Sequence, residues 1–99
     1  MTEAHLTIDR PSGLHARPAA LFVRTAAQFQ ASIRARNLSR DAEREADAKS
    51  ILSLMTLGIE QGHEILVRAD GSDEKAAIAA LRRLVESGFK EPSPASDQS

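Results

Sequence analysis

Hydrophobic and polar residues alternate along three stretches of the chain, at residues 4–8, 33–36 and 63–69. A period of two residues is typical of a strand that buries one face. A weaker strand is expected over residues 45–48, where acidic residues alternate with alanines. Because each stretch offers a single apolar face, we predict an antiparallel sheet that helices cover on one side only.

Apolar residues recur with helical spacing over residues 16–29 and 72–87. A third, short helix is expected to begin after Ser50, a good N-cap, and to end before Gly58. The order is therefore strand, helix, strand, strand, helix, strand, helix, an α+β arrangement. The side chains expected on the buried helix faces are Ala19, Phe22, Val23, Ala26, Phe29, Ala77, Leu81, Leu84 and Val85.

Three segments fall outside these patterns. Residues 38–44 are polar and predict an extended hairpin with a mobile tip, to which we assign no function. Gly88 is expected to follow the last helix, with Phe89 packing behind it. Residues 91–99 are rich in Pro and small polar residues, which predicts a disordered tail after a single domain over residues 1–90.

Composition excludes several classes of protein. The 99 residues are 41% hydrophobic and 27% charged, as in an ordinary soluble domain, and the net charge of −1 argues against a nucleic-acid binder. The chain has no Cys, so it has no disulfide framework. Because no apolar run approaches the ~20 residues that span a bilayer and no signal peptide is visible, we expect no membrane insertion and a cytoplasmic location. His5 and His63 fit ordinary strand positions, and we expect no metal site.

The candidate chemistry lies in residues 12–20. His15 follows a Gly turn, and Pro18 fits the first turn of the helix that comes next. His15 is therefore expected at a helix N-terminus, where unpaired N–H groups and the positive end of the helix dipole favour an anion. Arg17 adds a planar guanidinium suited to phosphate. Ser12 fits equally well as an orienting hydroxyl and as a plain turn residue, and a histidine exposed in a surface loop is the ordinary alternative for His15.

Three segments in this order resemble one known family. Residues 13–19 read Gly-Leu-His-Ala-Arg-Pro-Ala, residues 48–54 read Ala-Lys-Ser-Ile-Leu-Ser-Leu, and the third segment covers residues 57–65. They resemble the phosphorylation site and the regulatory serine segment of HPr, the histidine phosphocarrier of the bacterial phosphotransferase system. The resemblance implies an open-faced β-sandwich with strand order 1-4-2-3 and three helices on one face.

The resemblance also implies a role for each residue of the site. His15 would accept a phosphoryl group from phospho-enzyme I and pass it to the EIIA component of a sugar permease. The phosphate on Nδ1 would face the backbone N–H groups of Ala16 and Arg17, and Arg17 would clamp it during transfer. The chain would then be a stoichiometric, monomeric carrier and not an enzyme, with no bound cofactor, since magnesium would serve the donor enzyme.

A partner surface is expected on the short helix, which has more apolar residues than one face can bury. Ile51, Leu52 and Met55 are predicted to be exposed and to form a docking patch close to the histidine. Arg24 and Lys49 would form a basic rim around this docking patch. The rim is thinner than in many HPr proteins, which often have another basic residue where this chain has Ala27.

Ser50 supports two interpretations that are compatible. As an N-cap it would stabilise the short helix. In HPr relatives that have a regulatory HPr kinase/phosphorylase, the matching serine is phosphorylated. A phosphate on Ser50 would put negative charge beside the docking patch, and we hypothesise that it would block transfer by repulsion without unfolding the domain.

Three alternatives remain at this stage. Residues 85–89 resemble the end of nitrogen-branch regulatory phosphocarriers, whereas Lys49 and Ser50 resemble the sugar branch. The second alternative is a regulatory binding module that acts through phospho-Ser50 on a transcription factor; the presence of His15 argues against an exclusive role of this kind. The third is a hydrolase that uses His15, which would lack a companion general acid.

Overall fold

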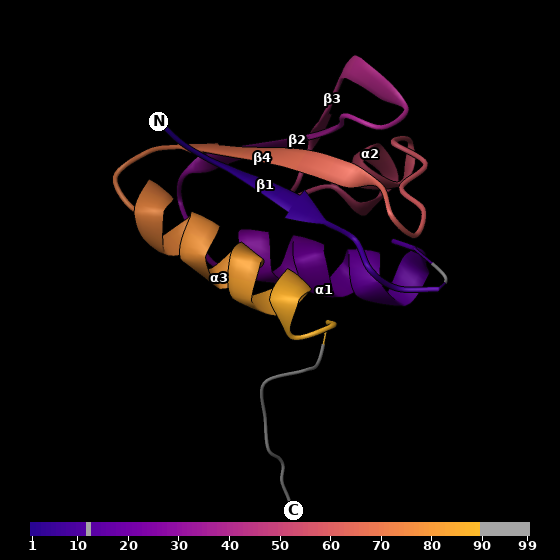
Figure 1. Ribbon diagram of the computed structural model, residues 1–99. Helices are drawn as coiled ribbons and strands as arrows, with labels where there is room; N and C mark the ends of the chain where they lie inside the picture. Colours follow the sequence, from indigo (N-terminus) through magenta and orange to yellow (C-terminus); the bar gives the residue numbers. More distant parts are fainter. Residues whose placement is uncertain (12, 90–99) are drawn as a thin grey trace, which may run out of the picture.

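The computed structural model describes residues 1–11 and 13–89. Four antiparallel strands form one sheet of order β1-β4-β2-β3, and α1 and α3 lie side by side beneath it (Figure 1). In chain order the elements are β1 (Thr2–Thr7), α1 (Ala16–Ala26), β2 (Ser32–Asn37), β3 (Asp41–Asp47), α2 (Ile51–Met55), β4 (Glu64–Asp70) and α3 (Glu74–Glu86). The predicted α+β class, element order and strand order are confirmed.

The core lies between the sheet and the two long helices. Ile33 and Ala35 of β2 face Ala69 and Val67 of β4 in register, and all four side chains are buried. The helices contribute most of the residues that their spacing predicted: Ala19, Phe22, Ala26, Ala77, Leu81, Leu84 and Val85 are buried, while Val23 and Phe29 are partly buried. Apolar burial on one face of the sheet therefore holds the layers together.

The hairpin between β2 and β3 differs from the prediction of a long polar tip with a strand over 45–48. The turn occupies only residues 38–40, and β3 already begins at Asp41. The register then shifts, because Asn37 pairs with Asp41 whereas Arg36 pairs with Glu45. The three residues between Asp41 and Glu45 form a bulge. β3 is an edge strand whose first five residues are exposed, so no apolar alternation marks its start.

α1 ends earlier than the predicted residue 29. Its C-cap is Ala27, and the N–H groups of Gln28 and Phe29 donate to carbonyls three residues back, which tightens the chain into a turn. The ammonium group of Lys49 donates to the Phe29 carbonyl at 2.6 Å. A cation thus satisfies a carbonyl just beyond the C-terminal end of α1, where the helix dipole favours positive charge.

Two carboxylates at the start of α3 tie distant parts of the chain together. Asp73 stands at the N-cap of α3, yet its side chain accepts from the backbone N–H groups of Gln30 and Ala31 at 2.8 and 2.9 Å. Glu74 accepts from the hydroxyl of Thr2 at 2.6 Å and lies 2.7 Å from the amino group of Met1.

Both carboxyl groups have a lowered pKa in the folded protein. The hydrogen bond from the Gln30 N–H lowers the pKa of Asp73 below its ordinary 3.8. The amino group of Met1, followed by the Thr2 hydroxyl, lowers the pKa of Glu74 from 4.5 to about 2. Folding therefore favours the ionised form of both side chains.

The C-terminal end of α3 matches the predicted cap. Gly88 follows with φ +77°, and Phe89 is buried behind the helix, with its N–H donating to the Leu84 carbonyl at 2.9 Å. Phe89 itself has φ +64°, which only a few non-glycine residues adopt. The predicted tail over residues 91–99 lies outside the described residues.

Two further features are absent from the described residues. None of their helices has the length and apolar character that crossing a membrane requires. Within residues 1–11 and 13–89, no three His, Asp or Glu side chains converge as metal ligands would.

We expect stability to fall with acid through Asp73 and Glu74. A carboxyl whose pKa is lower in the folded state stabilises the fold above its unfolded pKa, and that stability is lost as the pH falls towards the folded pKa. The double variant Asp73→Asn/Glu74→Gln should have a lower Tm than the wild type at neutral pH and a shallower decline of Tm between about pH 4.5 and 2, measured by circular dichroism.

Asp9→Asn is the matched control, because Asp9 is exposed and has no hydrogen bond or ion pair among the described residues. If the double variant and the wild type decline in parallel, these two carboxylates do not produce the acid sensitivity.

Candidate functional site

His15 stands at the N-cap of α1, as the sequence predicts. Its backbone is extended (φ −82°, ψ −167°), and its carbonyl accepts the first hydrogen bond of the helix, from the Ala19 N–H at 2.8 Å. The residue is exposed, and its imidazole makes no capping hydrogen bond. The buried side chains of Leu14 and Pro18 anchor the chain on either side of it. The ring is therefore at the surface, and no residue among 1–11 and 13–89 makes a hydrogen bond to its nitrogens.

The first turn of α1 offers donors to an anion beside this ring. The N–H groups at the start of a helix have no acceptor within the helix. Among the described residues, no other acceptor is bonded to the N–H groups of Ala16 and Arg17. Pro18, the third helical residue, has no N–H at all. The first turn contains no acidic side chain to neutralise the positive end of the dipole.

The loop before His15 is fixed by close backbone packing. Gly13 has φ +63°, and a Cβ placed on it would lie 2.5 Å from the Ile59 carbonyl oxygen and 2.6 Å from Glu60 Cα. The N–H of Gly13 donates to Arg10, and that of Leu14 donates to the same Ile59 carbonyl at 3.0 Å. Gly is required here both for the left-handed conformation and for the close approach. The loop between α2 and β4 thus sets the place of His15.

This arrangement suits a transient phosphoryl group. A neutral imidazole has a lone pair that can attack phosphorus, and the N–H groups at the start of a helix offer hydrogen bonds to the anion that results. Arg17, two residues later, is exposed. Its positive charge interacts unfavourably with the positive end of the helix dipole, and a bound anion offsets this repulsion. The other residue predicted here, Ser12, lies outside the described residues.

The predicted docking patch of α2 is exposed. Ile51, Leu52 and Met55 are 37%, 79% and 41% exposed, whereas Leu54 and Leu57 are buried. The short helix therefore divides its apolar residues between the core and solvent, as the sequence indicates. α2 packs against α1 and β3 at the end of the molecule where the His15 loop lies (Figure 1).

The two predicted rim residues differ in their surroundings. Arg24 is exposed in the last turn of α1. Lys49 is only partly exposed, since its ammonium group is bonded to the Phe29 carbonyl. Lys49 thus has a structural contact that the sequence does not reveal.

Ser50 is the N-cap of α2, as predicted. Its hydroxyl oxygen accepts from the Ser53 N–H at 3.2 Å, and its carbonyl accepts from the Leu54 N–H. The hydroxyl of Ser53 in turn accepts from the Asp47 N–H at 3.0 Å, which ties the end of β3 to α2.

Sequence reasoning missed the buried polar group that supports this end of the molecule. The Asn37 amide nitrogen, in a side chain that is 1% exposed, donates to the Leu57 carbonyl at 3.1 Å and to His63 Nδ1 at 3.0 Å. His63 Nδ1 also accepts from the Glu60 N–H at 3.1 Å. Nδ1 of His63 thus faces two N–H donors, one from a side chain and one from the backbone. The one signal in the sequence for this buried hydrogen-bonded group is the Asn at an inward position of β2, because a buried polar side chain needs hydrogen-bond partners.

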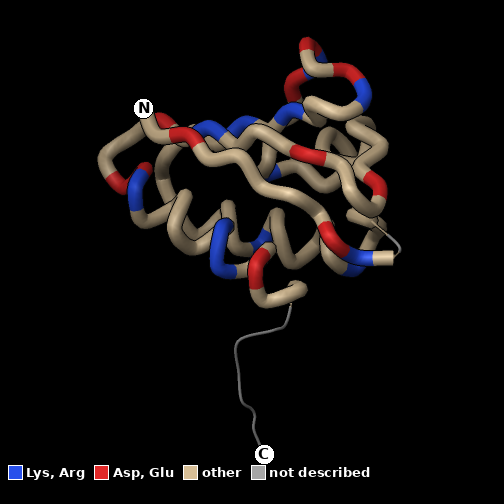
Figure 2. Tube along the Cα trace, in the orientation of Figure 1, with Lys and Arg blue, Asp and Glu red and all other residues tan. Residues whose placement is uncertain are grey.

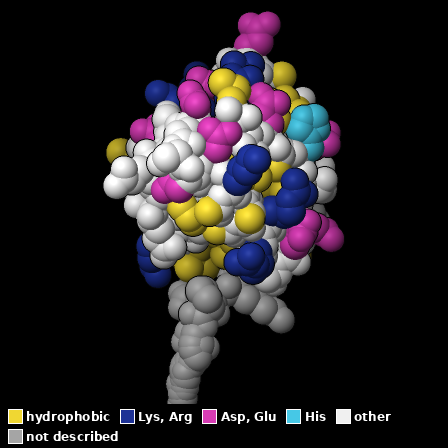
Figure 3. Space-filling model, turned by 90° about the vertical axis from the view of Figure 1, so that its left-hand side faces the viewer, with side chains coloured by type: hydrophobic (Ala, Val, Ile, Leu, Met, Phe, Trp, Pro, Cys, Tyr) yellow, Lys and Arg dark blue, Asp and Glu magenta, His cyan; other side chains and the backbone are white. Residues whose placement is uncertain are grey.

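The opposite end of the molecule, where the N-terminus and the turn between β4 and α3 lie, has a mixed surface. Figure 3 shows Lys and Arg side chains near the middle of that face, with acidic and small apolar areas around them. Its charges of both signs are interspersed.

A family model described as "PTS HPr component phosphorylation site" matches residues 2–87. The chain belongs to the HPr family. It is 44% identical over 91 residues to the phosphocarrier protein HPr of Xylella fastidiosa, covering 92% of this chain and 98% of that protein. The crystal structure of HPr-C-His from Thermoanaerobacter tengcongensis has a TM-score of 0.83 and 43% identity, over 94% of this chain and all of that one. These findings make the chain an HPr phosphocarrier of the phosphotransferase system.

Similar HPr domains also occur within larger proteins. The multiphosphoryl transfer protein of Haemophilus influenzae is 39% identical over 85 residues, which cover 86% of this chain and 17% of that protein.

We expect Gly13→Ala to be more damaging than the same change at Gly62. Both glycines have positive φ, but a Cβ on Gly62 would meet nothing within 4 Å, whereas one on Gly13 would press on the backbone of Ile59 and Glu60. Backbone strain alone should cost about 1–2 kcal/mol at either position, and the clash adds to it only at Gly13. The measurement is the free energy of unfolding by urea for both variants. Equal losses would show that the close packing of Gly13 contributes nothing.

Proposed function

We propose that His15 accepts a phosphoryl group from phospho-enzyme I and passes it to an EIIA domain of a sugar permease. The observation that carries the proposal is the exposed imidazole at the N-cap of α1, beside first-turn N–H groups with no other acceptor among the described residues. Membership of the HPr family supports the same assignment.

The transfer is a substitution at phosphorus. The lone pair of His15 Nδ1 forms a bond to the phosphorus carried by the donor's histidine. The bond between phosphorus and the donor nitrogen breaks, and the donor ring keeps that electron pair. Passage to the acceptor repeats these steps with His15 as the leaving group. Because few other bonds change, the site accelerates transfer by positioning the phosphoryl group and stabilising its negative charge. In this proposal the α1 amides and Arg17 do both.

Docking is assigned to the exposed side chains of α2. Ile51, Leu52 and Met55 offer an apolar surface that a donor and several acceptors can share, and Met adapts to partners of different shape. Arg24 adds a basic charge at the edge. Lys49 contributes mainly by holding the end of α1 in place, and its role in the rim is secondary.

Ser50 is proposed as a regulatory site for an HPr kinase/phosphorylase. A phosphate at the N-cap of α2 would suit the local backbone and would put about two negative charges next to the docking patch. Repulsion of acidic partners would then slow transfer while the fold stays intact. The nitrogen-branch alternative differs in its acceptor, so reconstituted transfer to purified EIIA proteins of each branch distinguishes the two.

The proposal predicts an acid-labile, base-stable phosphate on His15. The full chain is incubated with phosphoenolpyruvate, magnesium and purified enzyme I, and the product is analysed by mass spectrometry. One phosphoryl group per chain is expected, and none in His15→Ala. Phosphorylation that persists in His15→Ala would contradict the proposal.

In the same assay, Arg17→Ala should slow transfer by about tenfold or more, because a guanidinium that meets developing phosphate charge is lost. Its Tm should stay close to that of the wild type. Arg83→Ala, which removes an exposed arginine on α3, is the matched control and should transfer normally. Normal transfer by Arg17→Ala would remove Arg17 from the site.

Substitutions at Ser50 should separate its two roles. Ser50→Ala should lower the free energy of unfolding by about 0.5–2 kcal/mol through loss of the N-cap, with transfer from enzyme I nearly unchanged. Ser50→Asp keeps a capping oxygen and should retain most of the stability while it raises the KM for transfer. Unimpaired transfer by Ser50→Asp would count against regulation by charge at this position.

A further inference from the structure

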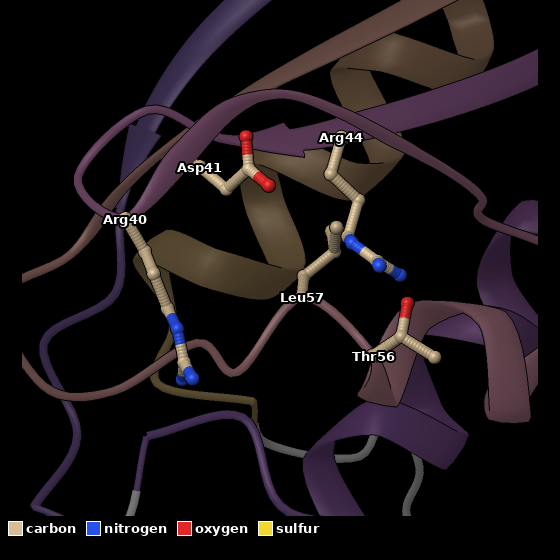
Figure 4. Close-up of a pocket in the computed structure, with 5 residues that line it drawn as sticks. All are labelled: Arg40, Asp41, Arg44, Thr56 and Leu57. Carbon is tan, nitrogen blue, oxygen red and sulfur yellow. The ribbon is translucent and has the colours of Figure 1, made fainter.

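The hairpin between β2 and β3 and the C-terminal end of α2 enclose a polar cleft of about 300 Å³. It is lined by Arg40, Asp41, Arg44, Thr56 and Leu57. Figure 4 shows the two arginine side chains descending from the hairpin on either side of Leu57, with that of Arg44 reaching towards Thr56. The cleft therefore lies between the bulged edge strand and the helix that bears the docking patch.

The guanidinium of Arg40 lies against Gly58. Gly58 has φ +58°, and a Cβ on it would overlap the guanidinium of Arg40. The bare backbone of Gly58 thus lets Arg40 lie against the loop between α2 and β4. The next residue of that loop, Ile59, holds Leu14 through its carbonyl. Arg40 accordingly adds a positive charge along the same loop that positions His15.

The cleft has an excess of positive charge. Among the described residues no ion pair joins Arg40 or Arg44 to a carboxylate, although Arg36 is paired with Glu45 in the same hairpin. Asp41 is the only acidic residue of the lining, and its carboxylate accepts from the Glu43 N–H at 3.3 Å. Figure 2 shows how densely charged residues follow one another in this hairpin.

We propose that this cleft receives a carboxylate side chain of the protein that docks on α2, with enzyme I as the first such partner. The inference rests on the proposed function and adds a contact to it. Thr56 directly follows Met55, so the cleft continues the docking patch. A guanidinium binds a carboxylate with two parallel hydrogen bonds, and 300 Å³ is at the lower limit of small-molecule sites but ample for an Asp or Glu side chain. The two arginines of the cleft lining thus add basic charge at the edge of the docking patch.

The test compares Arg40→Ala/Arg44→Ala with the wild type as a substrate of enzyme I. At low ionic strength the KM should rise about three- to tenfold, as expected for the loss of two exposed charge pairs. The kcat should not change, because His15 and α1 are untouched. The difference should shrink at high salt. Asp41→Asn should lower the KM, and Arg40→Asp/Arg44→Asp should raise it more than the double alanine variant.

The control is Arg82→Ala/Arg83→Ala, which removes two exposed arginines from α3 and should leave the KM unchanged. Binding to enzyme I without phosphoenolpyruvate is measured in parallel by calorimetry, so that a failure of phosphoryl transfer, which concerns the proposed function, is distinguished from a failure of docking. Equal KM and Kd values for Arg40→Ala/Arg44→Ala and the wild type would overturn the proposal. If KM and Kd are equal but the wild type binds inorganic phosphate and Arg40→Ala/Arg44→Ala does not, the proposal is also overturned, and the cleft is a site for small anions instead.

Discussion

The backbone contact between the His15 loop and the loop after α2 is the constraint on which the site depends. Leu14 donates to the Ile59 carbonyl, and Gly13 lies so close to Ile59 and Glu60 that no side chain fits between them. Through this contact the start of α1 is attached to a second part of the chain more than 40 residues away. The imidazole can then remain exposed without becoming loose, because Leu14 before it and Pro18 in the first turn of α1 are buried.

Exposure follows from what a phosphocarrier does. A site that hands its phosphoryl group to other proteins cannot enclose that group, and we propose that its donors are the backbone amides at the start of α1 and the guanidinium of Arg17. Single charges in such a place are weak because solvent screens them. We propose that Arg17 in the first turn of α1 and the hairpin arginines act together on a partner that docks on the exposed apolar residues of α2. The sheet itself separates the two roles: one face packs on the core, and most of the charged strand residues lie on the other face.

Much of the fold could be predicted because its signals are local. The alternation around Ile33 and Ala35, the helical spacing of Phe22 and Ala26, and the caps at His15 and Ser50 each depend on residues close in sequence. The resemblance to HPr then supplied the strand order, which no local pattern could determine.

The errors arose where long-range contacts decide the structure. The start of β3 was missed because an exposed edge strand has no apolar period. α1 gives way to a tight turn after Ala27, and Lys49, 20 residues beyond Phe29, bonds the Phe29 carbonyl in that turn. Asp73 stands at a helix N-cap position, but its carboxylate accepts hydrogen bonds from the backbone N–H groups of Gln30 and Ala31. The hydrogen bond between Asn37 and His63 is indicated in the sequence only by one polar residue at an inward position of β2.

The most direct measurement is the amide spectrum of the ¹⁵N-labelled chain before and after phosphorylation by enzyme I. If a phosphoryl group on His15 is held by the start of α1, the N–H resonances of Ala16 and Arg17 should move most, because they gain an anionic acceptor. Small shifts at those two residues, with the largest changes around His5 or His63, would contradict the account.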